Sequence, residues 1–104
     1  MIDLIKKLFH SDPPVNYSQL VKEGALIVDV RSKGEYAGGH IRGSVNIPVD
    51  QLSQQLNRLP KDKVIITCCA SGMRSATARG MLQSKGYPKV HNGGGWHSLQ
   101  SKLS

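Results

Sequence analysis

The chain has 104 residues, of which 38% are apolar and 5% aromatic, so it is long enough for one domain with a modest core. Its formal net charge of +7 is carried by scattered basic residues with few aromatic neighbours, which argues against nucleic-acid binding and favours small anions or an acidic partner protein. No apolar run is long enough to span a membrane.

The residues before position 15 are predicted to form an N-terminal extension to a single domain that occupies residues 15–104. Residues 1–10 have the pattern of a short amphipathic helix, and residues 11–14 end it with two prolines. This segment makes a poor signal peptide, because its lysines follow the apolar start and no small-residue cleavage site is present.

Short strands alternate with short helices along the rest of the chain. Strands are expected at residues 15–17, 25–30, 44–47, 64–68 and 89–91. Helices are expected at residues 19–23 with Ser18 as the cap, 32–37, 51–57 with Asp50 as the cap, 75–85 with Ser75 as the cap, and from Trp96 onward. The glycines at 93–95 are expected to form the turn before the last helix. This alternation predicts an α/β fold with a mainly parallel sheet.

The stretch from Cys69 to Ser75 carries the chemistry that the sequence predicts. Cys69 follows the apolar run at 64–68, so it lies at the carboxyl end of a strand, where open α/β sheets bind ligands. A loop and the start of a helix come next, and their N–H groups attract anions. A thiol in that field loses its proton more easily than a free cysteine does. The sequence therefore predicts a nucleophilic Cys69 in an anion-binding cradle.

Several motifs, in the order in which they occur, resemble those of the rhodanese family of sulfurtransferases. They are Val28-Asp29-Val30-Arg31 followed by Glu35-Tyr36, the stretch 39–48 that begins Gly-His-Ile and ends Asn-Ile-Pro, the loop Cys-x-x-Gly-x-Arg-Ser at 69–75, and Gly-Gly-Gly-Trp at 93–96. The resemblance covers most of the chain. It implies a small parallel β-sheet flanked by helices on both sides, and an enzyme that carries a sulfane sulfur as a persulfide on a cysteine.

The resemblance also implies roles for the residues of the loop and beside it. Cys69 is expected to be the catalytic nucleophile, and the substrate-binding loop is expected to consist of Ala70, Ser71, Gly72, Met73, Arg74 and Ser75. Arg74 is expected to brace the loop through a carboxylate; binding of the anionic substrate is the alternative. Independently of the resemblance, Asp29 and Arg31 leave the carboxyl end of a strand and are expected to support the site. The four-residue spacing of Arg31 and Glu35 allows a structural ion pair between them.

The other cysteine is given a structural role, as is His40, for which a proton carrier is the alternative; His91 and His97 are not expected to bind a metal. Cys68 is one residue earlier in the strand than Cys69, so its side chain is expected to pack in the core on the opposite face; a redox partner for Cys69 is the alternative. No metal or other cofactor is expected, because His91 and His97 have no ligand-like spacing with the cysteines. Adjacent cysteines are poor disulfide partners, and together with the absence of an export signal they predict a cytoplasmic location.

Three functions remain open from the sequence. The first is a sulfurtransferase that moves sulfur from a small anionic donor, thiosulfate or a persulfide, to a thiol, cyanide or thioredoxin-like acceptor. The resemblance implies that thiosulfate is the poorer donor, because Ala70 and Met73 are apolar where thiosulfate-specific rhodaneses often have extra basic or polar loop residues. The second is a sulfur-carrier or regulatory module with little turnover of its own. The third is a cysteine phosphatase, which is disfavoured because four residues separate Cys69 from Arg74, where such phosphatases have five.

Overall fold

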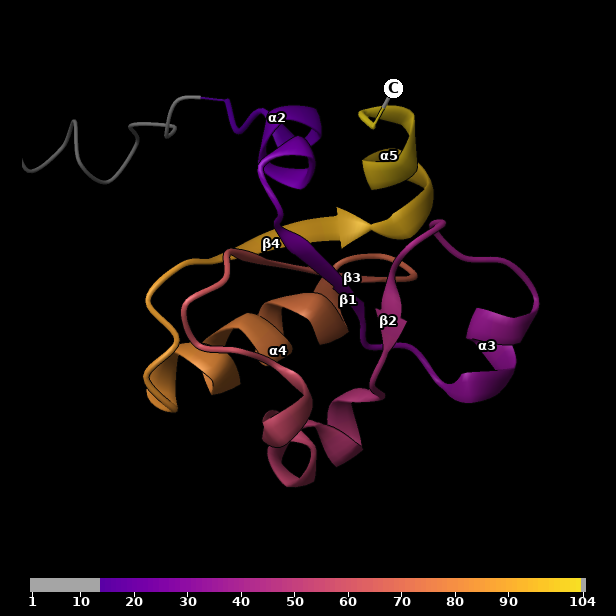
Figure 1. Ribbon diagram of the computed structural model, residues 1–104. Helices are drawn as coiled ribbons and strands as arrows, with labels where there is room; N and C mark the ends of the chain where they lie inside the picture. The colour runs from indigo at the N-terminus through magenta and orange to yellow at the C-terminus, as the bar shows by residue number, and fades with distance from the viewer. Residues whose placement is uncertain (1–13, 104) are drawn as a thin grey trace, which may run out of the picture.

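Four parallel strands form the sheet around which the chain folds (Figure 1), and the computed structural model describes residues 14–103. In spatial order, β2-β1-β3-β4, the strands are Val45–Asn46, Leu26–Asp29, Ile65–Cys69 and Val90–Gly95. Because every neighbouring pair is parallel, the carboxyl ends of all four strands lie at one edge of the sheet. The helix expected over residues 1–10 lies outside the described residues.

Helices cover both faces of this sheet, which confirms the predicted fold class. Figure 1 shows α2 (Tyr17–Lys22) and α5 (Trp96–Ser101) on one face. The opposite face carries α4 (Met73–Ser84) and the two 3₁₀ helices η1 (Val49–Gln54) and η2 (Leu56–Arg58). A short helix, α3 (Lys33–Ala37), lies beyond the edge strand β2. Within residues 14–103, no helix has both the length and the apolar character needed to cross a membrane.

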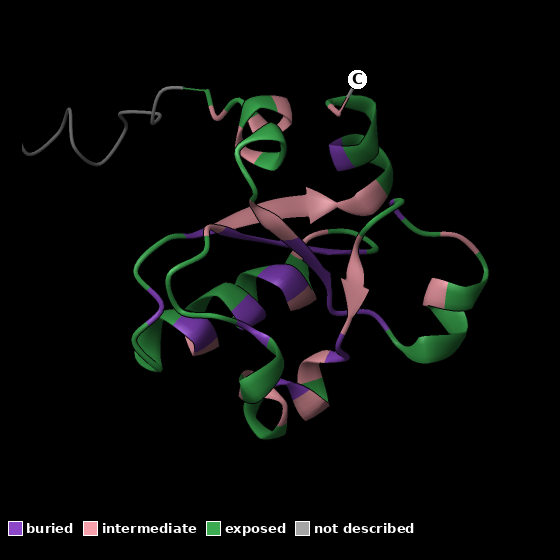
Figure 2. Ribbon diagram, viewed as in Figure 1, coloured by how far each residue is buried: buried purple, intermediate pink, exposed green. Residues whose placement is uncertain are grey.

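The central strand β3 divides the core into two clusters. All five of its residues are buried, as the purple colour in Figure 2 shows for the middle of the sheet. Side chains on one face, including Ile65 and Cys69, pack with the inner side of α4, while those on the other, including Ile66 and Cys68, pack with Leu99 of α5. Full burial of a leucine or isoleucine side chain contributes about 1.5–3 kcal/mol, so both layers hold the sheet.

The first described helix differs from the prediction. Residues 15–17 do not form the expected strand, because α2 begins at Tyr17. Its N-cap is Asn16 instead of Ser18, and the Asn16 side-chain oxygen accepts a hydrogen bond from the Gln19 N–H at 3.0 Å. A cap two residues earlier than expected therefore brings Tyr17, which was assigned to a strand, into the helix.

The prediction of a single helix over residues 51–57 is also wrong, because two 3₁₀ helices occupy this region. Asp50 is not a cap; η1 follows Pro48 and has no side-chain cap. Hydrogen bonds between residues three apart, such as the Gln51 N–H to the Pro48 carbonyl at 2.9 Å, replace the α-helical pattern. The Tyr87 hydroxyl, placed within reach of the Leu56 and Leu59 carbonyls at 3.1 and 2.6 Å, supplies a donor from outside the segment.

The glycines at 93–95 do not form the expected turn, because β4 runs through them to Gly95. The pairing with β3 shifts inside this stretch, where Thr67 faces Asn92 but Cys69 faces Gly95. Three steps along β4 thus match two along β3, which bends the strand as a bulge does. We call residues 92–95 the β4 bulge.

Candidate active site around Cys69

Cys69 is the last residue of β3, so it lies at the carboxyl edge of the sheet. The chain turns through residues 70–72 into α4, which begins at Met73. Gly72 is the N-cap and has a left-handed backbone with φ of 110°, a conformation that glycine adopts without steric cost. The prediction that Ser75 caps this helix is therefore wrong, and Ser75 is buried within the first turn.

The Cys69 sulfur lies inside the loop and accepts a hydrogen bond from the Gly72 N–H at 2.9 Å. The residue is 1% exposed. Burial alone raises the pKa of the thiol, but this is outweighed by the N–H groups of Ser75, Gly72 and Ser71 and by the Ser75 hydroxyl. The net result is a pKa below the ordinary value of a cysteine, because these donors stabilise the anion. The loop thus favours a thiolate.

Cys68 has the opposite environment. Its side chain is fully buried on the other face of β3, in the cluster with Leu99, which confirms the predicted core packing. Burial, with a smaller contribution from Asp29, raises the pKa of its thiol to about 12. Cys68 is therefore a neutral thiol at neutral pH.

The β4 bulge lies directly against the loop. A Cβ atom on Gly95 would be 3.0 Å from the Ala70 carbonyl oxygen, and one on Gly72 would be 3.6 Å from the Gly94 Cα atom. Side chains at these positions would separate the two segments. The glycines therefore allow the backbone of the β4 bulge to pack directly against the backbone of the loop.

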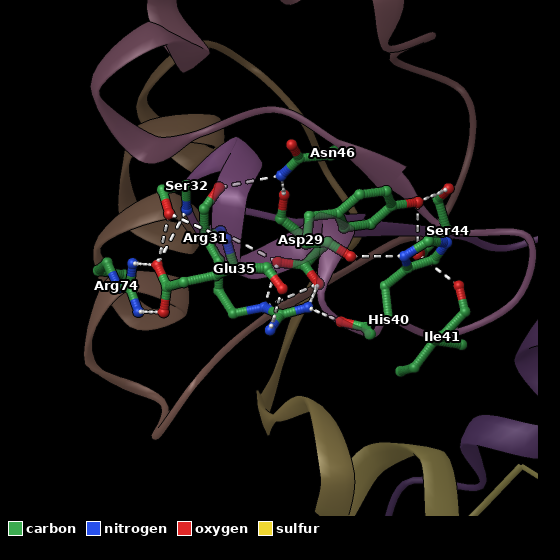
Figure 3. A network of polar contacts seen from close by, with 11 residues as sticks. Asp29, Arg31, Ser32, Glu35, His40, Ile41, Ser44, Asn46 and Arg74 are labelled. Atoms are coloured by element: carbon green, nitrogen blue, oxygen red, sulfur yellow. Dashed lines mark hydrogen bonds and ion pairs between the residues drawn. The ribbon is translucent and has the colours of Figure 1, made fainter.

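Arg74 forms a two-pronged ion pair with Glu35 of α3, as Figure 3 shows, with distances of 2.7 and 3.0 Å. This agrees with the prediction that a carboxylate braces the loop. The Arg74 bond, followed by hydrogen bonds from the Ser32 backbone and side chain, lowers the pKa of the Glu35 carboxyl to about 2. Glu35 also completes a capping box with Ser32, so one carboxylate joins the start of α3 to the start of α4.

The ion pair that the spacing of Arg31 and Glu35 allowed does not form, because Arg31 pairs with Asp29. Their side chains meet at 2.7 Å and both are almost fully buried. The Arg31 guanidinium also donates to the Gly39 carbonyl at 2.7 Å and lies 4.7 Å from the centre of the Trp96 ring. Hydrogen bonding to Asp29 raises the pKa of Arg31, although burial opposes it. The pair thus joins the end of β1 to α5 and to the turn after α3.

Among the described residues, one hollow lies at each end of the strands. The larger, of about 950 Å³, is at the amino ends of the strands, where Ala25, Val64 and Val90 line it, and so is far from Cys69. A smaller one of about 330 Å³ is bordered by Arg74 and Lys33. We regard the smaller one as the approach to the loop because Arg74 belongs to both.

The histidines have local contacts. His40 stacks on the Tyr36 ring with centroids 3.7 Å apart, and its Nδ1 lies 2.7 Å from the Tyr36 carbonyl. Within residues 14–103, no three side chains of His, Cys, Asp or Glu gather as metal ligands would.

Sequence reasoning missed one residue of this site, Asn92. Its side-chain oxygen accepts hydrogen bonds from the Ser75 hydroxyl and from the Gly94 N–H. The residue is 17 positions from Ser75, and no local pattern marks the contact. The one indication in the sequence is that Asn92 lies between the last predicted strand and the glycines at 93–95, where the chain approaches the carboxyl edge of the sheet.

Comparison with known proteins places these features in a family. The family model of the Rhodanese-like domain matches residues 13–102. The protein YqhL of Bacillus subtilis is 38% identical over 68 residues, which are 65% of this chain and 54% of that protein, so the match spans about half of that relative. The thiosulfate sulfurtransferase GlpE of Pseudomonas fluorescens is 30% identical over 84 residues, covering 81% of this chain and 77% of GlpE.

A solved structure agrees with this match. The structure described as rhodanese with anions, from E. coli, superposes with a TM-score of 0.68 and 27% identity. The superposition covers 72% of this chain and 91% of that one.

Proposed function

Since this chain belongs to the rhodanese-like domain family, we propose that it is a sulfurtransferase that carries a sulfane sulfur as a persulfide on Cys69. The observation that carries the proposal is the Cys69 sulfur at 2.9 Å from the Gly72 N–H, in a loop whose donors favour its anion. A persulfide bears its charge on the outer sulfur, and such donors stabilise that charge as well.

In the first step, the Cys69 thiolate attacks the outer sulfur of the donor. With thiosulfate, the new Cys69 S–S bond forms as the bond within thiosulfate breaks, and sulfite leaves with the electron pair. With a low-molecular-weight persulfide, the corresponding thiolate leaves. This is nucleophilic covalent catalysis, and neither step uses a cofactor.

In the second step, a nucleophilic acceptor attacks the outer sulfur of the persulfide. Cyanide forms a carbon–sulfur bond and leaves as thiocyanate, while a thiol or a thioredoxin-like protein leaves as a persulfide. In each case the bond to Cys69 breaks and its electron pair returns to the Cys69 thiolate. The first state is thus restored.

We assign substrate binding to the loop from Ala70 to Ser75 and a supporting role to Asp29 and Arg31. Ala70, Ser71 and Met73 are exposed, with Met73 80% exposed, so a donor or acceptor meets these residues first. The Asp29–Arg31 pair is buried, and its contacts hold the end of β1 and the turn after α3. We place the domain at residues 15–104 and, because both cysteines are free thiols, the protein in the cytoplasm.

Besides the length of the loop, the partner of Arg74 is a second argument against phosphatase activity. A phosphatase loop needs its arginine to hold the phosphoryl oxygens. Here both outer nitrogens of Arg74 bond to Glu35, at 2.7 and 3.0 Å. Binding a phosphoryl group through Arg74 would require that pair to break.

Intact-protein mass spectrometry tests the proposal. Incubation with thiosulfate, or with a low-molecular-weight persulfide, should make the protein one sulfur atom heavier, and cyanide should restore the starting mass with release of thiocyanate. Cys69→Ser should gain no sulfur, whereas the matched variant Cys68→Ser should gain it as the wild type does.

Each other outcome has a definite meaning. Loading without turnover would favour the sulfur-carrier module. Loading of Cys69→Ser, or equal loss in both folded variants, would refute the assignment of Cys69. A wild-type protein that takes up no sulfur from either donor while its thiol still reacts would refute sulfur transfer.

A further inference from the structure

The hydroxyl of Ser75 has one proton and lies among several acceptors. Its oxygen is 3.1 Å from the Gly72 carbonyl oxygen and also contacts the side-chain oxygen of Asn92. The same hydroxyl is among the groups that stabilise the Cys69 thiolate. One proton serves one strong hydrogen bond at a time, so Asn92 and Cys69 cannot both receive it.

Asn92 is held in place independently of Ser75. It lies in β4 opposite Thr67, and its side-chain oxygen accepts a second hydrogen bond from the Gly94 N–H at 2.9 Å. Gly94 has a left-handed backbone with φ of 79° and lies against Gly72 of the loop. The β4 bulge therefore presents the Asn92 oxygen to Ser75.

We propose that Asn92 is a positioning residue that competes with the Cys69 sulfur for the hydroxyl proton of Ser75. While Cys69 is a neutral thiol, Ser75 donates to Asn92. When Cys69 is a thiolate or a persulfide, the hydroxyl turns to the sulfur. This inference rests on the proposed function only in taking Cys69 as the reacting thiol.

The surroundings allow this turn at little cost. When Ser75 releases Asn92, the amide oxygen keeps the Gly94 N–H, so no buried acceptor is left without a partner. The Thr67 hydroxyl, 2.9 Å from the Ser75 carbonyl, fixes the backbone of Ser75, and the side chain alone has to rotate. A hydrogen bond to a charged sulfur is stronger than one to a neutral amide, so ionisation decides which acceptor holds the proton.

Among the other ionisable groups near Cys69, Arg74 is unchanged in every variant proposed below, and Cys68 is replaced by Ser in all of them. Arg74 of α4 and Cys68 of β3 interact electrostatically with Cys69. His91 precedes Asn92 in β4, and its ring packs edge-on to Tyr17 with centroids 6.5 Å apart. A shift in the titration of Cys69 that depends on Asn92 and Ser75 therefore reports on their contact.

The test is a titration of Cys69 by the ultraviolet absorbance of its thiolate, in a Cys68→Ser background so that one thiol titrates. The reference protein should have its midpoint below about 8.5, the value of a free cysteine. Asn92→Leu, which removes the competing oxygen at similar volume, should lower the midpoint by about 0.5–1 pH unit. Asn92→Asp, which offers a charged and stronger acceptor, should raise it.

The downward shift of Asn92→Leu distinguishes competition from structural support, because a loosened loop would raise the midpoint. The upward shift of Asn92→Asp is also expected from repulsion between its carboxylate and the thiolate. The second arm repeats Asn92→Leu in a Ser75→Ala background, where its effect should vanish. Upward shifts in both variants, no shift in either, or a Leu effect that persists without the Ser75 hydroxyl would overturn the proposal. If Asn92→Leu does not fold, Asn92→Ala provides the same comparison.

The titration and the sulfur-loading experiment fail independently. A protein that accepts no sulfur still yields a Cys69 midpoint, so the competition is decided even if sulfur transfer is refuted. A protein that accepts sulfur with the same midpoint in all Asn92 variants would retain the proposed function and lose this inference.

Discussion

Gly93 is the residue at which β4 and β3 have least room between them. A Cβ atom there would be 2.8 Å from the Thr67 carbonyl oxygen and 2.9 Å from side-chain carbons of Ile66 and Leu99. All three neighbours are buried and belong to the sheet or to α5. Gly93→Ala should therefore lower the free energy of unfolding by about 1–3 kcal/mol, measured by denaturant titration.

Gly80 provides the matched control for this substitution. It lies within α4, and a Cβ atom there would meet nothing within 4 Å. Gly80→Ala should raise the free energy of unfolding by about 0.5–1 kcal/mol, because alanine loses less backbone entropy in a helix. Equal effects of the two substitutions would contradict the close packing of the β4 bulge.

For individual residues, the sequence predicts a position or contact when it depends on neighbours that are close in the chain. Cys69 was predicted because the strand before it and the Gly72 turn after it are adjacent in sequence. Asn92 was not, since its partner Ser75 lies in another element and the contact exists only once β4 packs beside the loop. Glu35 was given the wrong partner for the same reason, because spacing favoured Arg31 while folding brings Arg74 within 2.7 Å.

The helices α3 and α4 are joined by the Glu35–Arg74 ion pair, whose pH dependence can be predicted. The Glu35 pKa is lowered from 4.5 to about 2, first by Arg74 and then by Ser32. Its stabilisation is fully present above the unfolded value and is lost as the pH falls through the folded value, because the unfolded chain binds the proton first. The difference in unfolding free energy between wild type and Glu35→Gln should thus shrink between pH 4.5 and about 2.

Glu23 of the α2 C-cap serves as the control in the same measurement. Within residues 14–103 its carboxylate forms no ion pair, so Glu23→Gln should change stability little. The Glu35 pair is partly exposed, and added salt should therefore reduce its contribution. A pH-independent difference for Glu35→Gln would show that Arg74 does not hold the carboxylate.

Among the elements, β1 and β3 were predicted from apolar runs, β4 only in its first residues, and α2 and the 3₁₀ helices less well. A buried strand such as β3 is specified by its own composition. A helix of six residues, such as α2, depends on which side chain reaches its first N–H groups, and Asn16 takes that role from Ser18. Carbonyls at the two ends of η2 accept hydrogen bonds from Tyr87, about 30 residues later, a contact that no local pattern indicates.

The whole molecule bears a formal charge of +7, which should attract anionic reagents to the thiol. Iodoacetate and iodoacetamide alkylate the same sulfur and differ in charge. The rate of alkylation of Cys69 by iodoacetate, divided by the rate with iodoacetamide, should fall as the salt concentration rises from about 0.01 to 1 M. The reason is that the screening length shortens from about 30 to 3 Å. A free thiol under the same conditions is the control, and a ratio that follows it at every salt concentration would refute the steering.

The overall architecture was the most predictable level, because alternating strands and helices leave few arrangements. The strand order β2-β1-β3-β4 could not be predicted from the alternation of strands and helices. Periodicity does not specify which strands are neighbours, and the resemblance to a known family supplied that information. The bulge in β4 was beyond both, since a glycine run indicates a turn as readily as an irregular strand.

The two cysteines face opposite sides of β3, and this has a consequence under oxidative stress. Peroxide converts a thiolate to a sulfenic acid, which is rescued when a second thiol condenses with it and releases water. Cys68 lies buried on the far face of the strand, and the sequence contains no third cysteine. Rescue then depends on a thiol from another molecule, and without one the next oxidation, to the sulfinic acid, inactivates Cys69 permanently.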